Sequence, residues 1–163
     1  MDQEDEKVED LYREIAEDLN KMIPVEWDTI WMYAEMLDDS ASSLFYFKVS
    51  NKEEYYYSHN IPEQFQVSED TYDSLLINLQ RKLRRLKEDY AEEHSDKWTT
   101  VTMKLTAAGK MSIDFSYEDI LSLGINMPKR IAIWAYENLG IYPKRKSVRE
   151  FLKEYIKNKE KNN

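Results

Sequence analysis

Hydrophobic and polar residues alternate along several stretches of this chain, and the alternation is most regular over residues 27–49. One face of a strand from Trp27 to Leu37 would carry every second residue from Trp27, and the other face would carry Asp28, Ile30, Met32, Ala34 and Met36. A polar turn, Asp38–Ser43, separates this run from a second one, Leu44–Val49. Two such runs joined by a short polar loop predict an antiparallel hairpin.

Three further strands are indicated by the same period of two. Residues 53–59 place Tyr55 and Tyr57 on one face and Tyr56 on the other. In Trp98–Leu105, the residues Val101, Met103 and Leu105 alternate with Trp98, Thr100, Thr102 and Lys104. Met111–Tyr117 follows after a turn in which Gly109 occupies a position that needs positive φ. We therefore expect a second hairpin and about five strands in all.

Helices are indicated where apolar residues recur every three or four positions. The first covers residues 5–22 and ends before Pro24, and the second runs from an N-cap at Ser68 to about Glu93. A short helical turn over Tyr117–Leu121, closed by Gly124, follows the last strand. A third helix begins at Pro128 and ends at Gly140, and a last one is capped by Ser147.

The order of these elements is α-β-β-β-α-β-β-α-α. Because the strands come in consecutive groups, the sheet should be mainly antiparallel and the fold class α+β. A length of 163 residues suits one domain with a sizeable core. We expect a single domain over residues 1–163, frayed at residues 1–4 and 158–163.

The amino-acid composition excludes several classes of protein function. The chain contains no cysteine, which excludes disulfides, thiolate catalysis and cysteine-bound zinc. Its first ten residues are acidic and polar, unlike a signal peptide, and no apolar run approaches the length of a membrane span. These features lead us to expect a cytoplasmic protein that does not contact a membrane.

Charge is distributed unevenly along the chain. Residues 1–70 hold 19 acidic and 5 basic residues, a net charge of −14, whereas residues 71–163 hold 13 acidic and 18 basic residues, a net charge of +5. The acidic front half argues against nucleic acid as the main ligand and suits a basic protein partner. The alternative is that the excess charge only keeps the protein soluble.

No arrangement of residues typical of catalysis or cofactor binding is found. The three glycines are not clustered into a phosphate loop, and His59 and His94 are far apart, so we expect no catalytic residue, cofactor or metal. Two alternatives stay open. Asp114, Glu35 and Asp38 are candidates for a metal-dependent hydrolase. Arg81, Lys82, Arg84 and Arg85 are candidates for a nucleic-acid-binding regulator, or they simply form a solvated helix face.

The sheet offers a candidate surface for a protein partner. Aromatic side chains with acidic neighbours suit docking of a basic protein, although they also suit simple coverage of the second side of a sheet. The candidate contact residues are Asp28, Glu35, Asp38, Asp39, Tyr46, Tyr56 and Asp114.

A succession of short segments spans nearly the whole chain and resembles the YezG/EsaG-like family of immunity proteins, also called antitoxins. Each segment is weakly specific by itself, and their order and spacing carry the resemblance. They are residues 22–27 (MIPVEW), 33–35 (YAE) with 44–47 (LFYF), 57–62 (YSHNIP), 72–76 (YDSLL), 98–99 (WT), 109–119 (GKMSIDFSYED) and 134–140 (WAYENLG).

The resemblance implies a small cytoplasmic protein of Gram-positive bacteria that is not an enzyme and needs no cofactor. Its partner would be the C-terminal nuclease domain of a toxin exported by the type VII secretion system, including toxins of the LXG class. The protein would bind that domain and hold it inactive, which protects the producing cell. The family supplies no catalytic motif to carry over, and the oligomeric state stays open.

Overall fold

The computed structural model describes residues 3–93 and 97–162 and divides the chain into two compact units, residues 1–118 and residues 119–163. Residues 1–2 and 163, which belong to the ends that we expect to be frayed, and His94 lie outside the described residues. The first unit contains the sheet with helices α1–α3, and the second contains helices α4 and α5.

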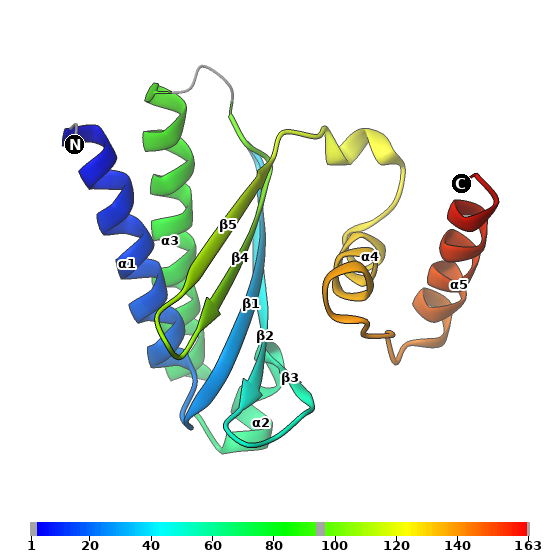
Figure 1. The fold of residues 1–163 in the computed structure, drawn as a ribbon, viewed down its shortest axis with the longest axis horizontal. Helices are drawn as coiled ribbons and strands as arrows, with labels where there is room; N and C mark the ends of the chain where they lie inside the picture. The colour runs from blue at the N-terminus through cyan, green and yellow to red at the C-terminus, as the bar shows by residue number, and fades with distance from the viewer. Residues whose placement is uncertain (1–2, 94–96, 163) are drawn as a thin grey trace. The chain divides into compact units, whose positions relative to one another are not determined.

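The first unit is organised around a five-stranded antiparallel sheet (Figure 1). Its strands are β1 (Trp27–Met36), β2 (Ala41–Val49), β3 (Tyr55–Tyr57), β4 (Thr100–Thr106) and β5 (Met111–Ser116). The two predicted hairpins pair through β1 and β4, which gives the order β3-β2-β1-β4-β5. The predicted α+β class, the antiparallel sheet and the order of the elements are confirmed.

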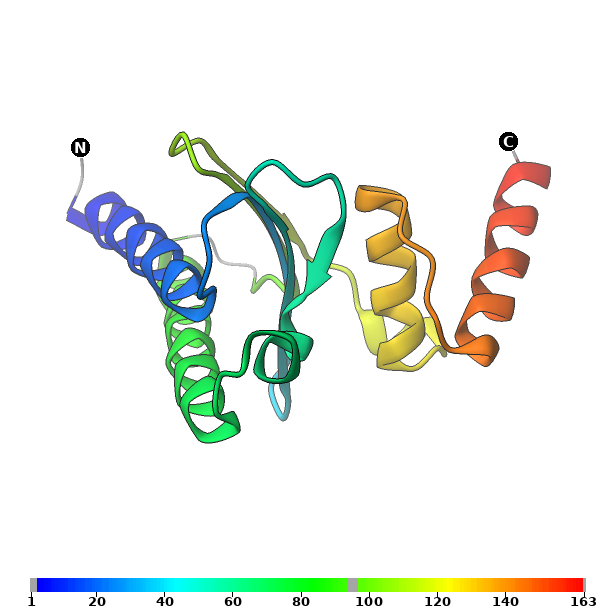
Figure 2. The same cartoon turned by 90° about the horizontal axis from the view of Figure 1, so that it is seen from below.

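Two long helices, α1 (Gln3–Met22) and α3 (Glu69–Glu93), lie side by side on one face of the sheet (Figures 1 and 2). The hydroxyl of Ser68 caps α3 as predicted, because the amide of Thr71 donates to it at 3.1 Å. The third strand is shorter than the predicted residues 53–59, because Ser58 and His59 belong to a 3-10 turn, η1 (Ser58–Asn60). Residues 60–65, which we expected to form a loop, include the short helix α2 (Ile61–Phe65). Pro62 is tolerated there because it occupies the first turn of α2.

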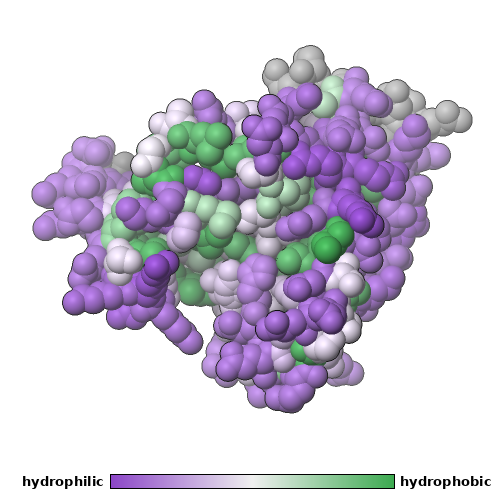
Figure 3. All heavy atoms as spheres, turned by 180° about the vertical axis from the view of Figure 1, so that it is seen from behind, coloured by the Kyte–Doolittle hydropathy of each residue, from purple (hydrophilic) through white to green (hydrophobic). Residues whose placement is uncertain are grey.

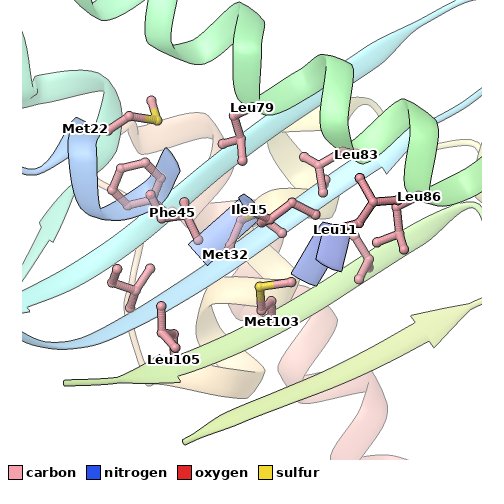
Figure 4. Packing of buried hydrophobic residues seen from close by; sticks show 14 of the residues in the cluster. Leu11, Ile15, Met22, Met32, Phe45, Leu79, Leu83, Leu86, Met103 and Leu105 are labelled. Atoms are coloured by element: carbon pink, nitrogen blue, oxygen red, sulfur yellow. The ribbon is translucent and has the colours of Figure 1, made fainter. Parts of the chain in front are cut away.

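The core fills the space between the two long helices and the sheet (Figure 4). Leu11 and Ile15 of α1 meet Leu79, Leu83 and Leu86 of α3 above the sheet, and all five are almost fully buried. The sheet contributes the even-numbered residues of β1 and the odd-numbered residues of β2 and β4, including Met32, Phe45 and Met103. The side chains on this face of the strands therefore follow the predicted period of two.

Trp98 is an exception to the predicted alternation. It precedes β4 in irregular backbone, is fully buried, and packs its ring 5.3 Å from that of Phe115. The period of two applies only within regular strands, so assigning Trp98 to the polar face with Thr100 was wrong.

The second unit consists of a 3-10 turn, η2 (Ile120–Leu123), followed by α4 (Met127–Leu139) and α5 (Lys146–Lys161), which pack against each other. Gly124 and Gly140 close η2 and α4 with φ of +70° and +68°. Across the helix pair, the carboxylate of Glu137 accepts hydrogen bonds from Tyr155 and Lys159, both at 3.3 Å. The N-cap of α5 is Arg145, not Ser147 as predicted.

Candidate protein-binding surface

The sheet has a second face, made of the side chains that point away from α1 and α3. Strand register groups them into cross-strand rows: Ser42, Glu35, Thr100 and Ser116; Leu44, Tyr33, Thr102 and Asp114; Tyr57, Tyr46, Trp31, Lys104 and Ser112. Three of the seven candidate contact residues, Glu35, Tyr46 and Asp114, therefore share this face. The structure brings them onto one face of the sheet, although they come from three different strands.

Glu35 does not present an exposed charge on this face. It is only 3% exposed, and its Oε2 accepts a hydrogen bond of 2.7 Å from the hydroxyl of Tyr33. Asp114, by contrast, is exposed on β5. Of the two, Asp114 has the exposure that a contact with a basic partner needs.

Glu35 and Asp114 are too far apart to share a metal ion. Strand β4 lies between their strands, and two strand spacings with an offset of two residues separate their Cα atoms by roughly 12 Å. Metal–oxygen bonds are only about 2.0–2.6 Å long. Within residues 3–93 and 97–162, no three His, Cys, Asp or Glu form a group suited to a metal ion. The geometry does not support the hydrolase alternative.

Aromatic rings occupy one cross-strand row of the second face, the row that contains Tyr57, Tyr46 and Trp31. The rings of Tyr46 and Tyr57 lie 5.2 Å apart, and the ammonium of Lys104 lies 5.1 Å from the centre of the Trp31 ring. Burial raises the pKa of Tyr57 to about 12, with smaller contributions from Tyr46 and Tyr72. Burial also raises the pKa of Tyr46. Both phenols are therefore neutral hydrogen-bonding groups at physiological pH.

Two other candidate contact residues, Tyr56 and Asp28, do not lie on the second face of the sheet. Tyr56 points to the helix-covered face, where its ring stacks on Phe47 at 5.6 Å and contacts Phe65 at 5.7 Å. Asp28 is exposed at an irregularity near the start of β1, where the register with β2 shifts between Trp27 and Thr29. Tyr56 therefore contributes to the core, and Asp28 lies at the opposite end of β1 from the β1–β2 turn.

The β1–β2 turn, residues 37–40, presents Asp38 and Asp39, which are both exposed. Cationic side chains of α3 hold its backbone. Arg84 donates to the carbonyls of Leu37, at 2.8 Å, and of Ser40, at 3.3 Å. Lys87, which is 6% exposed, donates to the carbonyl of Met36. These hydrogen bonds fix the backbone that carries the two carboxylates.

The basic residues of α3 thus act largely inside the first unit. The ammonium of Lys82 pairs with Asp18 of α1 at 2.8 Å, and Arg84 and Lys87 hold the β1–β2 turn. Burial lowers the pKa of Lys87, and the nearby charge of Asp38 partly offsets this effect. Arg81 and Arg85 are the exposed members of the cluster. This arrangement favours a structural role for the cluster over phosphate binding.

One exposed feature was not identified in the sequence. In the second unit, Leu121 is 66% exposed, Leu123 46% and Met127 39%. The sequence signal was available: both leucines lie at the predicted short helical turn closed by Gly124, and connecting segments usually run over the surface. No helix in the described part of the chain is long and apolar enough to cross a membrane.

Comparison with known proteins identifies the family. The sequence model described as "Immunity protein YezG-like" matches residues 8–153. The chain belongs to the YezG-like family of immunity proteins. The match begins in α1 and ends in α5, so it includes most of both compact units.

Named relatives agree with this assignment. "Immunity protein YezG" of Bacillus spizizenii is 51% identical over 154 residues, which cover 94% of this chain and 96% of the relative. "Immunity protein YezG" of Bacillus subtilis is 39% identical over 149 residues, covering 91% and 99%. "Type VII secretion system protein EsaG" of Staphylococcus aureus is 27% identical over 157 residues, covering 92% and 96%. As a YezG-like protein, the chain has an immunity role and is not an enzyme.

Proposed function

We propose that this YezG-like protein neutralises a secreted nuclease toxin by binding its toxic domain in the cytoplasm of the producing cell. The observation that carries the proposal is the charge of the first unit. Residues 1–118 hold 27 acidic and 13 basic residues, a net charge of −14. A nuclease domain is basic where it holds nucleic-acid phosphates. Electrostatic potentials of opposite sign raise the rate at which such partners associate.

The β1–β2 turn is the best-supported contact point within the first unit. Asp38 and Asp39 are exposed on a backbone that Arg84 and Lys87 already hold, so binding would order little additional chain. Asp114 and Tyr46 on the second face are further candidate contacts. Acidic groups on a fixed backbone can take the place of substrate phosphates in a basic cleft.

The test is a binding-kinetics experiment with the C-terminal nuclease domain of a type VII-exported toxin from the same organism. We expect association at low salt to fall about tenfold in the double variant Asp38→Lys/Asp39→Lys, because electrostatic steering acts mainly on the association rate. The difference should shrink at high salt as screening increases.

The matched control is Glu53→Lys/Glu63→Lys, which changes the net charge equally at two exposed residues outside the turn. This control should slow association less than the turn variant does. Absence of binding by the wild-type protein, or unimpaired cleavage of nucleic acid in the complex, would refute the proposed function. Equal slowing by both double variants would refute the role of the turn.

A further inference from the structure

The second unit carries an exposed apolar cluster, which we call the leucine knob: Leu121 and Leu123 of η2, and Met127 at the start of α4. Figure 3 shows hydrophobic surface gathered over η2, bordered by hydrophilic residues. From the exposed fractions of the three residues, the knob offers on the order of 300 Å² of surface, the lower end of the range for the largest apolar patch on a typical monomer, which is often functional.

Hydrogen bonds hold the backbone of the knob in place. The amide and hydroxyl of Ser122 donate to the carbonyl of Asp119 at 3.2 and 2.7 Å. Arg130 donates to the carbonyl of Ile125 at 2.6 Å, and the amide of Lys129 donates to Asn126 Oδ1 at 3.1 Å. Gly124 joins η2 to α4 with a φ of +70°, a backbone conformation that residues with a side chain rarely adopt. The leucines are therefore held in an exposed position by an ordered backbone.

The size of the knob indicates the kind of interface it would form. A standard protein interface buries about 800 Å² on each partner, so the knob is too small to hold two copies of the chain together by itself. It is the right size for the apolar centre of a mixed interface, where a few side chains supply most of the affinity.

We propose that the leucine knob is the anchor that inserts into an apolar pocket of the toxin domain, a proposal that rests on the function proposed above. The charge of the second unit indicates the surroundings of that pocket. Residues 119–163 hold ten basic and five acidic residues, a net charge of +5, which a basic nucleic-acid cleft would repel. The pocket that fits is bordered by acidic side chains and lies outside the cleft.

The acidic turn and the knob would then act on different rate constants. Charges at the edge of an interface mainly set the association rate, whereas apolar groups buried at its centre mainly set the dissociation rate. Loss of two leucines from a central pocket should therefore shorten the lifetime of the complex without slowing its formation.

The experiment measures association and dissociation of the full-length protein and the toxin domain. For Leu121→Ala/Leu123→Ala we expect dissociation to be about 10- to 100-fold faster, with association within about twofold of the wild type. The melting temperature should not fall, since both side chains are largely exposed. The matched control is Ile77→Ala, which removes a 48% exposed aliphatic side chain from α3 and should leave dissociation unchanged.

The outcomes separate the two proposals. If the wild-type protein binds and inhibits the toxin domain but the double leucine variant dissociates at the wild-type rate, only the knob proposal is overturned. If the wild-type protein does not bind the toxin domain, both proposals are overturned. If sedimentation shows a dimer of the free protein that the leucine substitutions abolish, a second copy occupies the knob and the knob proposal is again overturned.

Discussion

Lys82 and Asp18 illustrate at the residue scale why a charged cluster cannot be interpreted from sequence alone. In the sequence, Lys82 belongs to a basic run typical of phosphate binding. In the structure its ammonium lies 2.8 Å from Asp18, a residue 64 positions away that is only 5% exposed. An unpaired buried carboxylate destabilises the folded state, so Lys82 stabilises the protein by pairing with Asp18.

Removing Lys82 should therefore destabilise the protein. Because Lys82→Met leaves the buried carboxylate of Asp18 without its partner, and Lys82 itself is partly exposed, we expect a loss of about 2 kcal/mol in the free energy of unfolding. The double variant Asp18→Asn/Lys82→Met should recover part of the loss. Urea denaturation measures both values. A Lys82→Met protein as stable as the wild type would show that the pair has no structural role.

Tyr57 should make the protein sensitive to alkaline pH. Its pKa in the folded protein, about 12, is above the ordinary value of 10.0, so the unfolded chain loses this proton first. The contribution is fully present below about pH 10 and is lost as pH rises towards 12. Tyr57→Phe should make the decline in stability over this range less steep, measured by denaturation at several pH values. An unchanged slope would contradict the assignment.

At the scale of elements, strands and long helices were predictable because their periods of burial differ. The alternation over residues 27–49 identified β1 and β2, and Ser68 correctly marked the start of α3. Helix α2 was missed because five residues are too short to show a helical period. The second face was harder to predict: which candidate residues share it depends on the pairing of β1 with β4, a long-range contact that no local pattern encodes.

The β1–β2 turn is held by α3, and this gives a prediction for Arg84. Arg84→Met removes the donor to two turn carbonyls, so the amide of Leu37, which donates to Ser40, should exchange its hydrogen about fivefold faster. Amides in the middle of α3 should be unaffected. The control is Arg81→Met at an exposed position of the same helix. Equal exchange at Leu37 in both variants would show that Arg84 does not order the turn.

At the scale of the whole molecule, charge separates along the chain: −14 for residues 1–118 and +5 for residues 119–163. The family match includes most of both units, so we propose that residues 1–163 act together as one immunity domain. The acidic unit would supply attraction to a basic toxin domain, and the second unit would supply its apolar anchor. Opposite charges on the two units also favour one orientation of the partner over others.

The most direct test of this account is a titration of the nuclease domain of a type VII-exported toxin from the same organism with the purified protein, measuring cleavage of nucleic acid. The account predicts that cleavage falls to background at an equimolar ratio when both proteins are mixed well above their dissociation constant. Cleavage that continues at the full rate in the presence of excess protein would contradict the central claim that this protein neutralises a nuclease toxin by binding its toxic domain.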